Sequence, residues 1–536
     1  MTNFGALNWT IVVAYLAGTL VLGYFLSKRV RTAQHYYLGQ RTTPWWVIGV
    51  SVVATYFGAI TFLGGPAWSY KDGFAVIFIH INYPIVIFIV NALFLPFFYN
   101  TGVASIFDYL ERRFGLASRT LMSAVFLFGN IAYSGIMLYT TALVLQLITG
   151  MDVVNAILII AVVAVTYTML GGISAVIWTD LIQSAILFIG AAIVAVMLIA
   201  DLPGGFLGSL QDLKEIGRAN PFEYTFDPSV VATIWTGVIA MSVYHVVVYG
   251  VNQMMIQRTL AAKTLGDAKK AYAFMGYAAF LVYVVFFLIG ILLYSYYGGK
   301  DFDNDNRIVL DFVAMIGLPG LMGVITAAIV AAAMSSLDSS LNSMATVTTL
   351  DFYEKFFRKG RSPQHYLRAS RWFTLMWGVL TVVPAIIVAQ RADTSVLEIL
   401  SKVGVFLVGS KLAMFGLGFY SKHTTQRGVL AGVAAGFVAL WYVETYMDVA
   451  WPWYAVLGGV VSIGVSLAAS FVLDGRQEQY SLWTVQGQRE EFARKGLPEK
   501  RDGWYVIPGK IDRSSWYLLV YFVLCVVALA VFYDLI

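Results

Sequence analysis

The sequence predicts an all-α membrane protein with about fourteen transmembrane helices, and three observations support this fold class. Of its 536 residues, 59% are hydrophobic and 12% are charged, whereas soluble chains contain about 25% charged residues. The charges lie between apolar runs of about 20 residues, the length that crosses a bilayer as a helix. Two of these runs are interrupted by glycines and polar residues, which is typical of helices that break within the membrane.

The apolar runs are too long and too uniform for the alternating strands of a membrane barrel, so each is expected to be a helix. The expected spans are 8–27, 45–64, 74–98, 120–149, 153–170, 178–200, 230–254, 272–297, 312–348, 371–389, 396–420, 428–445, 453–474 and 516–535. The first run has no basic stretch before it and is long for a signal sequence, so we expect a retained helix. The single cysteine, Cys525, excludes an internal disulfide framework.

The distribution of Lys and Arg indicates the orientation. With the N-terminus outside, the loops that lie inside are 28–44, 99–119, 255–271, 350–371, 421–427 and 475–515. These loops contain 27 of the 35 Lys and Arg residues, as expected for cytoplasmic loops. An even number of spans then places both termini outside. We expect a monomer to function in the lipid bilayer of the plasma (cell inner) membrane, without a nucleic acid partner.

The two interrupted runs, 51–65 and 242–253, lie at equivalent positions in two halves of the chain. Such a pair predicts an inverted-repeat secondary transporter. The expected domains are a first helix and inside loop at 1–44, a first repeat at 45–200, an outside loop at 201–229, a second repeat at 230–427, and peripheral helices at 428–536. The charged inside loop 475–515 is expected to be a solvated linker.

A polar stretch, MSSLDSSLNS at 334–343, interrupts an apolar span. On a helix, Ala332, Ser335, Ser336 and Ser339 share one face. Isolated serines can bond to their own helix, and small residues allow close packing, but Asp338 costs several kcal/mol in the membrane unless it is paired or ligated. Hydroxyl, carbonyl and carboxylate oxygens favour a small hard cation. The alternative is a purely structural hydrogen-bond network.

A second acid, Asp180, follows the Gly171–Gly172 turn near the start of a span. A carboxylate in the first turn of a helix is favoured by the helix dipole, so this position alone does not separate a structural role from a functional one.

Three segments together resemble the sodium:solute symporter family. They are GGISAVIWTDLIQ (171–183), YGVNQMMIQRTLAAKT (249–264) and AAAMSSLDSSLNSMATVTTLDFY (331–353), and the similarity extends over about residues 8–430. The resemblance implies a leucine-transporter-type fold of five-plus-five inverted repeats, with one extra helix before them and three after. It also implies coupling to the sodium ion and alternating access.

The resemblance assigns residues to two ion sites. The main sodium site falls on the carbonyls of Ala54, Phe57 and Ala332 and on the hydroxyls of Ser335 and Ser336. A second cation, bound by some members, falls on Asp180, Asp338 and Ser339. The sugar and sialic acid branches have Ser or Thr at the position of Asp338. An acid there strengthens a second cation site, accepts a proton, or forms an internal ion pair, and the sodium stoichiometry stays open.

The same resemblance places the solute between the broken helices and their neighbours. The candidate solute-binding residues are Tyr56, Gly58, Thr61, His80, Asn82, Asn130, Tyr133, Asn252 and Lys411. Packing is the alternative role for each aromatic residue, and a satisfied buried imidazole is the alternative for His80. Lys411 lies about ten residues from the inner end of its span, where it either reaches the interface or an acid or faces the central cavity and favours an anionic solute.

The predicted function is sodium-coupled import of a small polar organic solute, namely a sugar, a sugar acid or a monocarboxylate. The alternative is an uncoupled facilitator or channel, which cannot accumulate its solute against a gradient. The chain contains no HExxH or GxSxG motif, so no enzymatic activity is expected.

Overall fold

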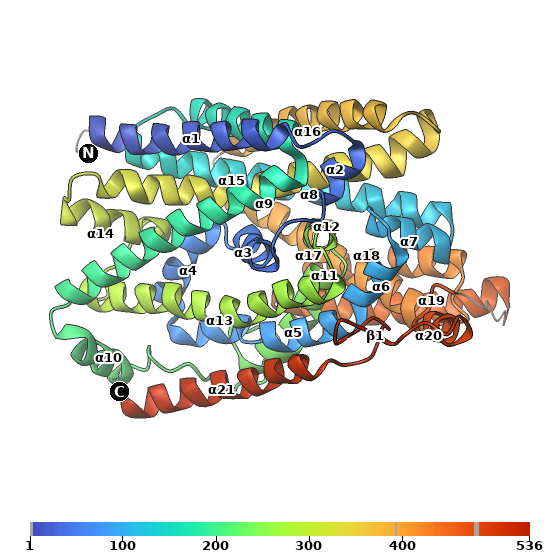
Figure 1. Cartoon of the computed structure of the whole chain (residues 1–536). Coiled ribbons are helices and arrows are strands. Elements are labelled where there is room, and N and C mark those ends of the chain that lie inside the picture. Colours follow the sequence, from blue (N-terminus) through green and yellow to red (C-terminus); the bar gives the residue numbers. More distant parts are fainter. Residues whose placement is uncertain (1–3, 392–393, 476–481) are drawn as a thin grey trace.

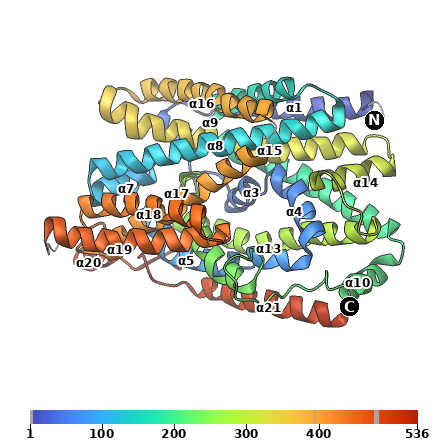
Figure 2. The ribbon, with the colours of Figure 1, turned by 180° about the vertical axis from the view of Figure 1, so that it is seen from behind.

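The computed structural model describes residues 4–391, 394–475 and 482–536, which form a mostly helical membrane protein (Figure 1). Long helices run side by side, with α1 and α16 along one edge and α21 along the opposite edge, as the reverse view in Figure 2 also shows. Ten described helices are long and apolar enough to cross a membrane, or up to twelve if each of two bent pairs is one span. The count of fourteen stays a prediction.

The N-terminal half contains α1 (Ala6–Ser27), α2 (Ala33–Leu38), α3 (Trp45–Tyr56), α4 (Ala59–Asp72), η1 (Phe74–His80), α5 (Tyr83–Ile89), η2 (Val90–Phe94), α6 (Leu95–Thr101), α7 (Ile106–Arg113), α8 (Leu116–Thr149), α9 (Val153–Asp201) and α10 (Gly205–Glu215). The next part contains η3 (Thr236–Ala240), α11 (Met241–Gly250), α12 (Gln253–Leu260), α13 (Leu265–Tyr296), η4 (Asp305–Arg307), α14 (Ile308–Ile316), α15 (Leu321–Val347), η5 (Thr348–Phe357), α16 (Pro363–Arg391) and α17 (Thr394–Tyr420). The C-terminal part contains α18 (Gln426–Tyr446), η6 (Trp451–Trp453), α19 (Tyr454–Asp474), α20 (Val485–Arg494), the antiparallel strands β1 (Lys500–Arg501) and β2 (Trp504–Tyr505), and α21 (Arg513–Leu535).

Both predicted interruptions are breaks between helices. The axes of α3 and α4 differ by 55°, and the chain leaves the helical conformation at Phe57 and Gly58. The axes of η3–α11 and α12 differ by 51°, with the break at Val251 and Asn252. A helix that ends leaves the carbonyls of its last turn without intrahelical partners. Each break therefore offers carbonyl oxygens in the middle of the bundle.

The predicted Gly-Gly turn is a kink within α9. Gly172 has φ 56° and ψ −152°, a conformation that favours glycine. A Cβ atom at this position would lie 2.7 Å from the carbonyl oxygen of Tyr36, so the close approach of α2 also requires glycine. The kink separates the predicted spans 153–170 and 178–200, and it sets the direction of the segment that contains Asp180.

The polar stretch lies on α15, which occupies the centre of the bundle. Every residue from Ile325 to Val347 is buried, and α9, α8, α1 and α16 pack around this helix. The serines and Asp338 are therefore shielded from both lipid and bulk water, and each polar atom needs a partner within the protein or a ligand.

The charged centre of the loop 475–515 is exposed from Ala493 to Gly503, as a solvated linker would be, but the flanks of this centre within 483–512 are packed against the bundle. The C-terminal flank is docked against the helix ends, where the buried ammonium of Lys269 contacts Asp512 at 2.5 Å. Gly509 donates to the carbonyl of Ala92 at 2.7 Å, within the π-helical turn η2. Asn100 donates to the carbonyl of Val506 at 2.6 Å. The part of this loop that follows the charged stretch is therefore anchored to the helix ends.

Candidate functional site

The main predicted ion site forms one small cavity. Ala54 and Phe57 of the first break line this cavity together with Ala332 and Ser335 of α15. Its volume is about 10 Å³, which is room for about one water-sized particle. The remaining wall comes from α9, through Gln183, Ser184, Leu187 and Phe188. Residues more than 270 positions apart in the sequence thus enclose a space that fits a single small ion.

The two serine hydroxyls of this site have their protons committed elsewhere. Ser335 donates to a carboxylate oxygen of Asp180 at 2.5 Å. Ser336 donates to the backbone carbonyl of Thr55 at 3.1 Å. A hydroxyl group has one proton and two lone pairs, so both oxygens keep lone pairs that can face a cation.

Asp180 is held by a buried ion pair that the sequence analysis did not identify. The guanidinium of Arg258, on α12, lies 3.4 Å from Asp180, and neither side chain is exposed. Arg258 also donates to Ser51 at 2.9 Å and to the hydroxyl of Ser339. Ser51 in turn donates to Asp180 at 2.5 Å. The arginine lies within the segment 249–264 that carries part of the family resemblance. Its sequence context does not distinguish it from an arginine in a solvent-exposed loop.

Asp338 lies on the other side of this pair and contacts only hydroxyl groups in the part of the chain that the structure describes. Tyr167 donates to it at 2.6 Å, and the hydroxyl oxygens of Ser339 and Thr179 lie 3.1 and 3.4 Å from it. The group formed by Asp180, Asp338 and Arg258 therefore contains two carboxyl groups and one guanidinium, all fully buried.

Three of the predicted solute-binding residues meet around a histidine that the sequence analysis did not select. Asn82 accepts from Nδ1 of His245 at 2.7 Å, since its amide nitrogen donates to backbone carbonyls. Nε2 of His245 therefore accepts from the hydroxyl of Tyr56 at 3.1 Å. His80 completes the cluster through a contact of 3.1 Å with Tyr83. The only sequence signal for His245 is its place in the interrupted run 242–253.

Aromatic rings enclose this polar cluster. His80 stacks on Tyr283 with ring centroids 3.4 Å apart. The ring centroids of Tyr56 and Tyr249 are 5.6 Å apart. The hydroxyl of Tyr249 is buried without a hydrogen-bond partner in the described part of the chain. Together these side chains offer stacking surfaces and a few polar atoms, which is the usual composition of a small-molecule site.

Two of the other predicted solute-binding residues, Thr61 and Tyr133, lie beside this aromatic cluster, since Thr61 bonds Tyr283 and Tyr133 is close to Tyr56. The side chain of Thr61 is buried. Tyr133, on α8, is 40% exposed.

The rest make the following contacts elsewhere. Asn130 bonds Phe126 and Ser340 and so joins α8 to α15. Asn252 caps α12 by accepting from the amide of Met254 at 3.0 Å. Gly58 packs so closely that a Cβ atom there would lie 2.5 Å from the Met137 side chain.

Lys411 lies apart from the aromatic cluster, on α17. Its side chain is 9% exposed, and its ammonium is 5.9 Å from the ring centroid of Phe126. No acidic side chain of the described residues lies within 4 Å of this ammonium. A buried cation without an acidic partner is costly in the membrane and therefore marks a position where an anion would be stabilised.

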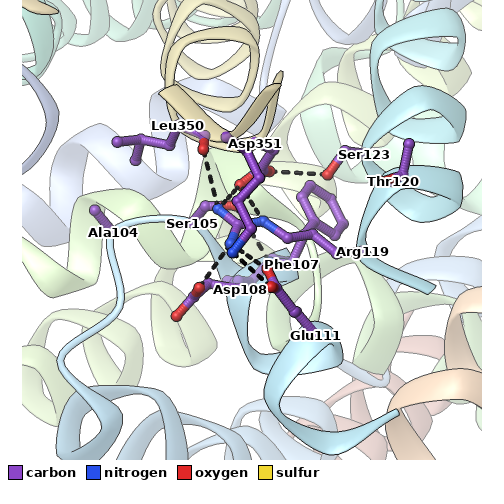
Figure 3. Close-up of polar contacts among 12 residues, drawn as sticks. Ala104, Ser105, Phe107, Asp108, Glu111, Arg119, Thr120, Ser123, Leu350 and Asp351 are labelled. Carbon is purple, nitrogen blue, oxygen red and sulfur yellow. Dashed lines mark hydrogen bonds and ion pairs between the residues drawn. The ribbon is translucent and has the colours of Figure 1, made fainter. Parts of the chain in front are cut away.

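A second ionic cluster lies where the basic loops gather, at the junction of α7, α8 and η5 (Figure 3). The guanidinium of Arg119 contacts Asp351, Asp108 and Glu111 at distances between 2.5 and 2.7 Å. Asp351 also accepts from Ser105 and Ser123. Since Ser105 caps α7, the cluster fixes the short connection between α6 and α8 to the end of the helix that contains the polar stretch.

The broken helices, the ion-sized cavity between the first break, α9 and α15, and the aromatic cluster define a secondary transporter that couples a solute to a cation. The family model that matches residues 36–436 is the sodium:solute symporter family, and the chain belongs to that family. It is therefore a sodium-coupled symporter that works by alternating access and not an enzyme. The family and the sodium-coupled function predicted from the segment resemblance are confirmed, and the fold is confirmed as that of a mostly helical membrane transporter, whereas the repeat pattern stays a prediction.

Relatives and solved structures agree with this assignment. The chain is 28% identical to the sodium/sialic acid symporter NanT of Aliivibrio fischeri, over 88% of this chain and 94% of that one. It is 30% identical to the human sodium-coupled monocarboxylate transporter 1, over 81% of this chain and 73% of that one. The solved structure of an outward-open, substrate-bound sialic acid symporter with a novel sodium site superimposes with a TM-score of 0.82, at 26% identity, over 89% of this chain and all of that one.

Proposed function

We propose that this symporter takes up a small organic anion, either a sugar acid or a monocarboxylate, together with sodium. The observation that supports this solute class is Lys411, a buried cation without an acidic partner among the described residues. Bacterial relatives are named for sialic acid and animal relatives for monocarboxylates, and both solutes contain a carboxylate. A carboxylate would neutralise the ammonium in surroundings where an unpaired charge is unfavourable.

The proposed sodium ligands are the carbonyls of Ala54, Phe57 and Ala332 and the hydroxyls of Ser335 and Ser336. Four of these residues line the same ion-sized cavity, and Ser336 is bonded beside it to Thr55. Because the ligands come from both α3 and α15, a bound ion would hold the first break against the central helix. Sodium then favours the arrangement that also binds the solute, and this coupling is reciprocal.

A second cation near Asp180, Asp338 and Ser339 follows from the charge of this group. Arg258 compensates one carboxylate, so that the other carboxyl group, when ionised, has no countercharge among the residues described. An added cation would remove that charge. It would bind on the Asp338 side, because Arg258 already occupies the side of Asp180 and Ser339.

The remaining features of this proposal concern the topology, the membrane, the oligomeric state and the place of the solute. The fold consists of two five-helix inverted repeats, and fourteen spans place both termini outside the cell. The loops rich in Lys and Arg lie inside, as does the ionic cluster around Arg119. The membrane is the plasma (cell inner) membrane, and a monomer is the working unit. The solute lies between Tyr56, the His245 cluster and α17, close to the sodium cavity at the first break.

The solute class is tested on purified protein by thermal shift in sodium and, separately, in potassium. We expect monocarboxylates or sugar acids to raise the melting temperature only in sodium, whereas neutral sugars of the same size do not. Lys411→Met should abolish the shift, and Lys411→Arg should retain part of it. Stabilisation by neutral sugars alone would contradict the solute class. Anion binding that survives Lys411→Met would assign this lysine a structural role.

Transport itself is tested in proteoliposomes with an inward sodium gradient and the solute found in the binding screen. A symporter accumulates the solute above its external concentration, and accumulation stops when the gradient is dissipated. Equilibration without accumulation would favour a facilitator instead.

A further inference from the structure

A third helix contributes an unpaired oxygen to the sodium cavity. Ser184, on α9, lines the same small space as Ala54, Phe57 and Ser335. Its side chain is 4% exposed, and its hydroxyl has no hydrogen-bond partner among the residues that the structure describes. Buried hydroxyl groups in proteins are nearly always bonded, so this one calls for an explanation.

Ser184 differs from the other helical hydroxyls nearby. A serine or threonine in a membrane helix usually donates to the carbonyl four residues earlier. Thr179 does so to Ala175 at 2.9 Å, and Thr55 does so to Ser51 at 2.7 Å. Ser184 makes no such bond to Asp180, although its helix continues through this point. Its oxygen and proton are therefore both available to whatever occupies the cavity.

The proposed sodium ligands come from only two sides of the cavity. Ala54 and Phe57 belong to the first break, and Ala332, Ser335 and Ser336 belong to α15. Hard cations in proteins bind about six or more oxygens, so five leave room for another. On the α9 side, Leu187 and Phe188 are apolar. The amide nitrogen of Gln183 bonds Tyr15 and Tyr167, at 3.3 and 3.5 Å, although its amide oxygen is unpaired.

We propose that the hydroxyl of Ser184 is a sixth oxygen ligand of the sodium ion. This inference rests on the sodium site proposed above. With Ser184 included, the ion contacts three helices: α3 through its broken end, α15 through its serines, and α9 through Ser184. Sodium binding then draws the second half of α9 toward the centre of the bundle, so that the position of α9 depends on whether the site is occupied.

The test is the sodium concentration that half-saturates the thermal shift of the purified full-length protein. Ser184→Ala should raise this concentration by about three- to tenfold, since tenfold corresponds to roughly 1.4 kcal/mol. Ser184→Thr keeps the hydroxyl and should stay near the wild-type value. Ser343→Ala is the matched control, because Ser343 on α15 is also buried without a partner among the described residues but does not line the cavity.

The outcomes separate this inference from the sodium site itself. If Ser335→Ala raises the half-saturating concentration and Ser184→Ala does not, the site stands and Ser184 is not a ligand. If neither variant changes it, the proposed sodium site is wrong. An equal rise in Ser184→Ala and Ser343→Ala would indicate a general effect of packing and overturn the role of Ser184. If a variant does not fold well enough for thermal shift, binding of radioactive sodium to membranes replaces it.

Discussion

The hydroxyl of Ser335 donates a hydrogen bond of 2.5 Å to Asp180, and this contact joins the sodium cavity to the buried ion pair behind it. The carboxylate draws the serine proton away from the cavity and increases the negative charge on the oxygen that faces it. If Ser335 is a sodium ligand, as proposed above, Asp180 acts on the ion through Ser335 without touching it.

Asp180→Asn should weaken sodium binding without removing the serine, and it should also lower stability because the buried Arg258 loses its countercharge. The amide oxygen can still accept from Ser335, but it has no full charge, and hydrogen bonds to charged groups are worth about 1.5–3 kcal/mol. We expect the half-saturating sodium concentration to rise about tenfold in a thermal-shift titration. Asp311→Asn, on the surface of α14, is the control and should behave as wild type. An unchanged sodium titration in Asp180→Asn would show that the Ser335 bond is purely structural.

Arg258→Met should destabilise the protein strongly, because it leaves Asp180 buried without a countercharge. Breaking a buried ion pair by removing one partner costs about 3–5 kcal/mol. The measurement is the melting temperature in detergent without sodium. The double variant Arg258→Met/Asp180→Asn removes both charges and should recover much of the loss. If the double variant is as unstable as the single one, the arginine acts through packing and not through its charge.

Asn82→Leu should reduce solute binding more than stability. It removes the acceptor for Nδ1 of His245 and frees the imidazole that holds the hydroxyl of Tyr56. An unsatisfied buried donor costs about 1–3 kcal/mol. Part of that cost is relieved if the ring of His245 rotates to another acceptor. We expect the half-saturating solute concentration in uptake assays to rise about tenfold, with sodium binding in the absence of solute unchanged. A parallel loss of sodium binding would indicate general damage.

Much of this architecture is predictable from local sequence. The breaks at Phe57 and Asn252 follow from glycine and polar residues in apolar runs, and the serines of α15 stand out because hydroxyls are rare there. Arg258 and Lys269 were not predicted to be buried. A cation between two apolar runs has the same sequence signature whether it meets water or an acid, and Asp180 and Asp512 are distant in sequence. The sequence around His245 shows no pattern that distinguishes a binding residue from a histidine packed in the core.

Lys269→Met tests whether the C-terminal segment is held by its buried pair. The ammonium of Lys269 bonds Asp512 at 2.5 Å and the carbonyl of Tyr505 at 2.8 Å. Its loss leaves the buried carboxylate without a countercharge, held only by the backbone N–H of Tyr505, and leaves a partly buried carbonyl unpaired. We expect a lower melting temperature and faster proteolysis within 483–512. The neighbouring Lys270→Met is the matched control, because Lys270 is 43% exposed and its contact with Asp267 is 3.7 Å. Equal proteolysis of both variants would contradict a specific role for Lys269.

Glu111 makes the stability of the Arg119 cluster dependent on pH. Partial burial alone would raise the pKa of Glu111, but hydrogen bonds from Lys355 and Arg119 outweigh it and hold the pKa below its usual value of 4.5. A carboxyl group with a lowered pKa in the folded state stabilises the protein above the pKa of the unfolded chain, and this contribution is lost as the pH falls through the folded value. Lys355, on η5, lies 2.5 Å from Glu111 on α7. Protonation of Glu111 therefore weakens the contact between α7 and η5.

Glu111→Gln should therefore lower the melting temperature at neutral pH, and the difference from wild type should shrink as the pH falls below about 4.5. The measurement is the melting temperature across pH 3–8 for both proteins. Glu490→Gln is the control, because this glutamate lies on the surface of α20 and accepts its hydrogen bond from the neutral side chain of Gln486. A difference between wild type and Glu111→Gln that is constant over this range would mean that the side chain contributes by packing and not by its charge.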